Sequence, residues 1–188
     1  RFATENIRKP AAAIELWEDV LTVQEDPPEA LEQLETLYER EKDYEQLVNI
    51  LERRLEQTEG EAIAPLLDKL GLVLSSRLHD EERAFEAWKR LLTVDPEHRK
   101  AQNEIRKRAL SLHDWETLEW LYRSYGTIAE LVRTLDSQVK NLSAPAEKTK
   151  LLFSIAGLWR TEMDQPLRAI KSLEAILELD NRSVRAAK

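Results

Sequence analysis

The side chains best suited to acid–base chemistry or metal binding in this sequence are its three histidines, His79, His98 and His113. An imidazole can act as a general base and is a common metal ligand near neutral pH. No two of these histidines stand four positions apart, no HExxH motif is present and no cysteine is available to complete a metal site. All three lie at predicted helix junctions, and two are followed directly by aspartate. We therefore interpret them as residues of helix junctions.

The residues of other common active sites are also missing. The absence of cysteine excludes a disulfide framework, a thiolate zinc site and a cysteine nucleophile. The four glycines are isolated and form no phosphate-binding loop, and no serine stands in a Gly-x-Ser-x-Gly elbow. The carboxylates Glu32, Glu35, Glu39 and Asp43 are interpreted as one solvated helix face. The sequence thus predicts a chain that is not an enzyme and has no cofactor and no metal.

Composition narrows the class of protein further. Of the 188 residues, 34% are charged and only four are glycine, which favours helices with solvated faces over sheets joined by tight turns. The net charge of −8 argues against nucleic acid as the partner. The longest uncharged stretches, such as 151–159, are too short to span a bilayer. We expect a cytoplasmic protein with a protein or peptide partner; a cysteine-poor secreted protein is the alternative.

Segments that are far apart in the sequence resemble one another, which is the signature of a repeat array. The segment Ala13–Trp17 aligns with Ala84–Trp88, and Leu34–Tyr38 aligns with Leu118–Tyr122. Ala84 in turn aligns with Ala169, farther along the chain. Several segments keep their register under these alignments, so we interpret the chain as a series of related units.

Each repeat unit is predicted to consist of paired helices. Apolar residues recur three and four positions apart, period-two alternation is absent, and Asp43, Asp80 and Asp114 stand at N-cap positions. The expected helices are 10–24, 28–41, 43–57, 61–77, 80–94, 97–110, 114–124, 127–141, 145–162 and 165–179. We also expect a further helix to begin near Asn181 and residues 1–7 to end an earlier one, so that the chain is a fragment of a longer array.

Ala84, Trp88, Leu91 and Pro96 follow a small-x3-aromatic-x2-apolar-x4-Pro spacing. This spacing resembles the second helix of a tetratricopeptide repeat (TPR), and the Leu70-Gly71 pair upstream resembles the Leu-Gly pair of its first helix. The resemblance covers essentially the whole chain. It implies an all-α, right-handed α-solenoid of antiparallel helix pairs, with about 10–11 helices in a single domain over residues 1–188.

One irregularity interrupts the repeat. The spacing between equivalent second helices is longer from Ala84 to Ala169 than from Ala13 to Ala84. The additional length falls between about 97 and 126, and it predicts one extra short helix there. This helix either changes the course of the superhelix or is a tolerated packing variant.

The five tryptophans receive different roles from the TPR register. Trp17, Trp88 and Trp159 occupy positions where TPR helices interlock, and Trp115 is expected at a seam between helices. Trp120 aligns with Thr36, a position that should face the groove.

TPR arrays bind partners mainly on the concave surface lined by their first helices, so the resemblance implies a binding groove. In the amino-terminal half its expected positions are Glu29, Glu32, Thr36, Glu39 and Asp68. In the carboxy-terminal half the expected partner-binding residues are Lys100, Asn103, Lys107, Trp120, Arg123, Lys150, Phe153 and Arg160. The charge divides along the same line, because residues 1–94 carry 12 basic and 22 acidic side chains whereas residues 95–188 carry 16 and 14.

The sequence therefore predicts a non-catalytic scaffold that binds a partner peptide or protein on its concave face. An acidic partner would use Trp120 and Phe153 as apolar anchors and the lysines and arginines as charge partners. Alternatively, the cations are solvated and the aromatic residues pack between helices. Two other functions stay open: a structural spacer or self-assembly module, and a non-catalytic part of a larger enzyme or signalling protein.

Overall fold

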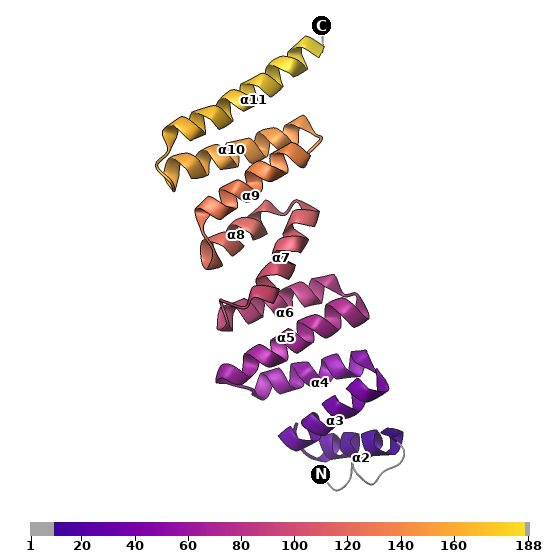
Figure 1. The fold of residues 1–188 in the computed structure, drawn as a ribbon. Coiled ribbons are helices and arrows are strands. Elements are labelled where there is room, and N and C mark those ends of the chain that lie inside the picture. The colour runs from indigo at the N-terminus through magenta and orange to yellow at the C-terminus, as the bar shows by residue number, and fades with distance from the viewer. Residues whose placement is uncertain (1–9, 187–188) are drawn as a thin grey trace. The chain divides into compact units, whose positions relative to one another are not determined.

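A computed structural model describes the backbone of residues 10–186 and the side chains of residues 10–179. This part of the chain is all-α and contains no strand (Figure 1). Its helices are α2 (Pro10–Val23), α3 (Pro28–Glu41), α4 (Tyr44–Gln57), α5 (Ile63–Val73), α6 (Glu81–Val94), α7 (Arg99–Leu112), α8 (Trp115–Tyr125), α9 (Ile128–Asn141), α10 (Pro145–Thr161) and α11 (Pro166–Ala186). A 3-10 turn at Gly60–Ala62 precedes α5, and a π turn at Leu74–Leu78 follows it.

The predicted helices are confirmed, and the one expected at 61–77 corresponds to α5 together with its π turn. Their ends lie close to those expected, except at the carboxy-terminal side of the chain. There the prediction of a new helix near Asn181 is wrong, because α11 continues without a break to Ala186. After α6 the matching position is Pro96, which lacks the N–H that a continuing helix needs; Asn181 keeps its N–H, so the helix can run on. The helix end expected at residues 1–7 lies outside the described residues.

The extra helix is also confirmed. Three helices separate α2 from α6 and four separate α6 from α11, and both α7 and α8 lie within the 97–126 region. The chain divides into two compact units, residues 1–107 and 108–188, and the division falls inside α7. The organisation of residues 1–188 as a single solenoid stays a prediction.

Local capping explains where several helices begin. The Asp43, Asp80 and Asp114 carboxylates accept hydrogen bonds from the backbone N–H groups of the residues three positions on, at 3.3, 3.0 and 3.1 Å. These bonds satisfy N–H groups that have no partner within the helix. The predicted N-caps are therefore confirmed.

Several junctions between helices use a left-handed backbone. Positive φ angles occur at the non-glycine residues Asp26, Lys42, His79, His113 and Asp164. At the ends of α3 and of the π turn, this conformation reverses the chain and lets its N–H groups bond to the last helical carbonyls. His79 and His113 are thus residues of helix junctions, as the sequence predicts.

In the first unit, α3, α4, α5 and α6 bury a continuous apolar core. Leu34, Leu47, Leu67 and Leu91 are at most 1% exposed. Trp88 is 3% exposed and lies directly over Gly71, so close that a Cβ atom at Gly71 would lie 2.8 Å from Trp88 Cδ1. Trp17 on α2 is only half-buried, less than its predicted core position implies.

The second unit has a core of its own. Leu118, Leu131, Leu151 and Ile155 are at most 1% exposed, and Trp159 is buried beside them. Trp115 packs against this core, as predicted. Arg168 of α11 lies over the Trp159 ring, with its guanidinium carbon 4.5 Å from the ring centroid, which anchors the start of α11 to α10.

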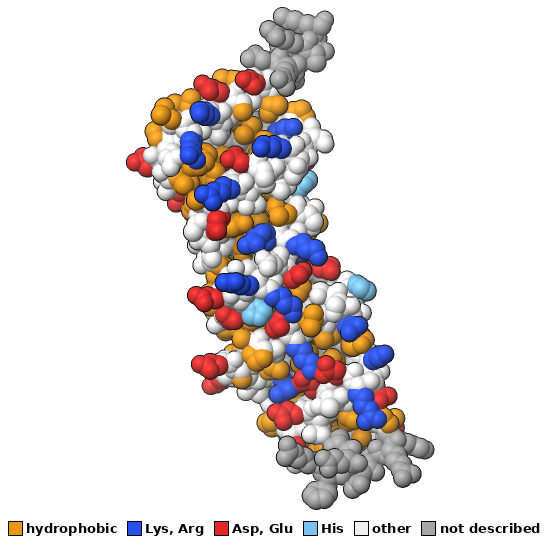
Figure 2. All heavy atoms as spheres, viewed as in Figure 1, with side chains coloured by type: hydrophobic (Ala, Val, Ile, Leu, Met, Phe, Trp, Pro, Cys, Tyr) orange, Lys and Arg blue, Asp and Glu red, His pale blue; other side chains and the backbone are white. Residues whose placement is uncertain are grey.

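Acidic and basic side chains are interspersed on the face drawn in Figure 2. Apolar exposure is largest on α11, where Leu167, Ile170, Leu173 and Leu177 are 40–75% exposed. Within residues 10–186, no helix combines the length and the apolar composition that crossing a membrane requires.

Candidate partner-binding surface

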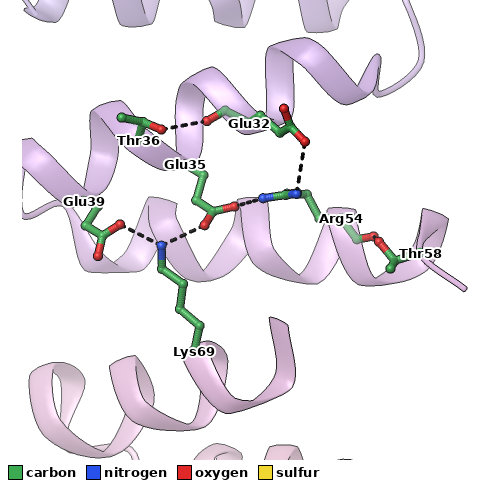
Figure 3. A network of polar contacts seen from close by, with 7 residues as sticks. All are labelled: Glu32, Glu35, Thr36, Glu39, Arg54, Thr58 and Lys69. Atoms are coloured by element: carbon green, nitrogen blue, oxygen red, sulfur yellow. Dashed lines mark hydrogen bonds and ion pairs between the residues drawn. The ribbon is translucent and has the colours of Figure 1, made fainter. Parts of the chain in front are cut away.

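A network of charged side chains joins α3, α4 and α5 and includes two of the predicted amino-terminal groove residues, Glu32 and Glu39 (Figure 3). Its centre is Glu35, which contacts Arg54 of α4 with one carboxylate oxygen and accepts a hydrogen bond from Lys69 of α5 with the other, at 2.7 Å. Lys69 also donates to Glu39 at 2.6 Å, and Arg54 reaches Glu32 at 3.4 Å. These carboxylates are therefore already paired within the chain.

The interpretation of Glu35 as a solvated residue is wrong. Glu35 is 9% exposed, because it points toward α4 and α5 rather than into water. Burial of a carboxylate is tolerated when cations and hydrogen bonds compensate it, as Arg54 and Lys69 do. The sequence does contain a basic residue on each of the next two helices, Arg54 and Lys69, and these residues could have indicated that Glu35 is paired.

We expect the network to lose part of its stabilising effect at alkaline pH. Burial lowers the pKa of Lys69, but hydrogen bonds and charges from Glu35 and Glu39 outweigh burial and raise this pKa above 10.5. A group whose pKa is raised by folding stabilises the folded state below its unfolded pKa, and this stabilisation is lost as the pH rises through the folded pKa.

Urea unfolding at about pH 8 and about pH 11.5 measures this effect. Between these two pH values, the free energy of unfolding of the wild type should fall by about 0.5–1 kcal/mol more than that of Lys69→Met. This range is the one expected for a partly exposed ion pair. Equal losses in the two proteins would remove Lys69 from the explanation.

The three predicted residues of α7 lie in the first unit. Lys100 is paired with Asp68 of α5, with 3.0 Å between Nζ and Oδ1. Asn103 accepts a hydrogen bond from Arg106 at 2.9 Å, and Lys107 is exposed. Lys100 therefore already has an acidic partner, whereas Lys107 projects into solvent.

On α8, the two predicted residues are partly engaged. Trp120 is half-buried and packs edge-to-face against Tyr125, with ring centroids 5.5 Å apart. Arg123 is bound to Glu119 at 2.8 Å and to Glu162 at 3.3 Å. The pair with Glu162 links the end of α8 to the end of α10.

On α10, the three predicted residues share one face. Lys150, Phe153 and Arg160 follow one another at spacings of three and seven positions, which places them within about 80° of one another around the helix. All three are exposed, and Phe153 is 56% exposed. Among the described residues, neither Lys150 nor Arg160 forms an ion pair.

The histidines contribute to turns. His98 Nδ1 accepts a hydrogen bond from the N–H of Ala101 at 3.3 Å, and His113 stacks on Trp115 with ring centroids 5.4 Å apart. Over the described part of the chain, no group of three or more His, Asp or Glu residues is placed to hold a metal ion.

No protein-family model and no curated protein matches the sequence. Similar solved structures include nearly identical TPR-like repeats assigned to a kinesin light chain of Podosopora anserina, at 15% identity over 93% of this chain and 88% of that chain, with a TM-score of 0.36. A variant of those repeats is 16% identical over 94% and 89% of the two chains, with a TM-score of 0.37. The C-terminal part of a TPR repeat-containing protein from Cytophaga hutchinsonii is 14% identical over 90% and 59%, with a TM-score of 0.34.

Proposed function

We propose that this TPR-like helical array is a non-catalytic interaction scaffold that binds an acidic peptide segment of a protein partner in its second unit. The carrying observation is Phe153, which is 56% exposed on α10 between the exposed cations Lys150 and Arg160. An exposed aromatic ring flanked by uncompensated positive charge suits a ligand that combines an apolar side chain with carboxylates.

The predicted residues contribute unequally. Lys150 and Arg160 can pair with a carboxylate without breaking an ion pair among the described residues. Arg123 must exchange Glu119 or Glu162 for the ligand, so its net contribution is smaller. Phe153 supplies the apolar anchor, with Trp120 as a partly covered second one.

The test is selection of a displayed library of random peptides on the intact chain, followed by affinity measurement for the enriched sequences. We expect enrichment of aspartate and glutamate beside an aliphatic or aromatic residue. Phe153→Ser/Lys150→Glu should weaken binding by about tenfold or more, because it removes the anchor and reverses one charge. Arg123→Glu should weaken it less and reduce its salt dependence.

A matched control exists in the same unit. Leu167→Ser/Lys171→Glu makes the same kind of change on α11, where Leu167 is 75% exposed and Lys171 is exposed. It should leave the affinity within about twofold. If the α10 variant and this control bind equally well, the proposed surface is not the binding site.

A further inference from the structure

A cavity of about 340 Å³ lies in the first unit between the ends of α3 and α5 and the beginning of α4. Its lining is mostly apolar and includes Leu47, Leu72 and Val73. Leu72 is 44% exposed, so its side chain is available from solvent. The volume falls within the range of pockets that enclose a ligand group.

Cations line this cavity although residues 1–94 are strongly acidic overall. Lys42, Lys69 and Arg77 line it together with one carboxylate, Glu39. Lys69 is paired with Glu39 at 2.6 Å, which leaves the charges of Lys42 and Arg77. Among the described residues, neither of these two forms an ion pair.

The backbone places Arg77 at this cavity through the π turn Leu74–Leu78. Arg77 lies in the widened turn that follows α5, and Leu72 lies in the last turn of α5 itself. The guanidinium carbon of Arg77 lies 5.5 Å from the centroid of the Tyr44 ring. This contact holds the charge beside the apolar lining and leaves guanidinium N–H groups available for an anion.

The second unit has an ion pair at the two positions that correspond to Glu39 and Arg77 of the first unit. In the second unit, Arg123 corresponds to Glu39 in the register that aligns Leu34 with Leu118, and Glu162 corresponds to Arg77 in the register that aligns Ala84 with Ala169. Those two side chains pair with each other at 3.3 Å. In the first unit, Glu39 pairs with Lys69 instead, and among the described residues the guanidinium of Arg77 is left without a carboxylate.

From this arrangement we infer that the cavity is a second peptide-binding site, which takes one aliphatic side chain of an acidic segment. The side chain packs on Leu72, and carboxylates on either side of it pair with Lys42 and Arg77. The site lies in the first unit and uses none of the residues assigned to the α10 surface, so either site can exist without the other.

The probe is a fluorescein-labelled peptide with two glutamates on each side of one leucine. Fluorescence anisotropy with the intact chain should show saturable binding that weakens as salt is added. Replacing the leucine by glycine, or the glutamates by lysines, should each weaken binding by about tenfold or more. Equal binding of either analogue, or no binding of the parent peptide at millimolar protein, would overturn the inference.

Variants of the chain assign the site. Lys42→Gln/Arg77→Gln should weaken binding of the peptide by about tenfold, whereas Arg90→Gln, which removes an exposed charge from α6 outside this cavity, should leave it within about twofold. If Phe153→Ser/Lys150→Glu abolishes binding and the Lys42→Gln/Arg77→Gln variant does not, the peptide occupies the α10 surface and the cavity is not a site. The opposite result assigns this peptide to the cavity, and the α10 surface is then judged by the selection experiment described for it.

A measurement on the unmodified chain guards against a variant that fails to fold. Backbone amide resonances of Leu72, Ser76 and Arg77 should shift on titration with the leucine peptide and stay in place with the glycine analogue. Shifts confined to α8 and α10 would overturn the inference.

Discussion

Trp88→Ala is expected to lower the free energy of unfolding by about 3–5 kcal/mol, the range for removing a large buried aromatic side chain. Trp88 is 3% exposed and occupies the space that Gly71 leaves open on α5. An alanine at this position would leave a cavity that the rigid helix pair cannot close. Urea unfolding followed by far-UV circular dichroism measures the change.

A control on the same helix separates packing from helix propensity. Val94 is 47% exposed, so Val94→Ala should change stability by less than about 1 kcal/mol. A loss below about 1 kcal/mol for Trp88→Ala itself would contradict both the burial of this residue and the TPR register from which its position was predicted.

Gly71→Ala is expected to destabilise the chain by about 1–3 kcal/mol, although alanine is the better helix former by about 1 kcal/mol. The reason is steric, because the new Cβ would lie 2.8 and 2.9 Å from Trp88 Cδ1 and Cε2. The indole is buried and rigid, so it cannot move aside without disturbing α5 and α6. The same urea titration measures the loss.

The chain supplies both a control and a rescue for this prediction. A Cβ at Gly157 in α10 would meet no heavy atom within 4 Å, so Gly157→Ala should stabilise the chain by about 0.5–1 kcal/mol. The repeat pairs Ala156 with Leu173 where the first unit has Gly71 with Trp88. Gly71→Ala/Trp88→Leu should therefore lower the free energy of unfolding by less than the sum of the two single substitutions. Strictly additive losses would argue against a direct clash between the two side chains.

The helices and their caps could be predicted because they depend on neighbours within one or two turns. Asp80 precedes an apolar helical pattern, and its cap bond joins residues three apart. The repeat register likewise placed Trp88 correctly from the spacing of Ala84, Trp88 and Leu91. Local pattern and internal repetition indicate the same elements, so these predictions support one another.

Features that depend on packing between helices were harder to predict. The burial of Glu35 depends on Arg54 and Lys69, which are 19 and 34 residues away. Trp120 is half-buried and packs edge-to-face against Tyr125, a contact that the register did not predict. Arg77 reaches the cavity from a π turn, for which the sequence has no distinctive motif.

The spacing of contacts along the chain has a consequence for how this protein folds. The ion pairs that join helices connect residues at most a few tens apart, such as Asp68 with Lys100 and Arg123 with Glu162, which are 32 and 39 residues apart. Contacts of such short range need little loop closure, which is the condition for rapid folding. Each helix meets its stabilising neighbours soon after it is synthesised, so the array is suited to fold progressively as it leaves the ribosome.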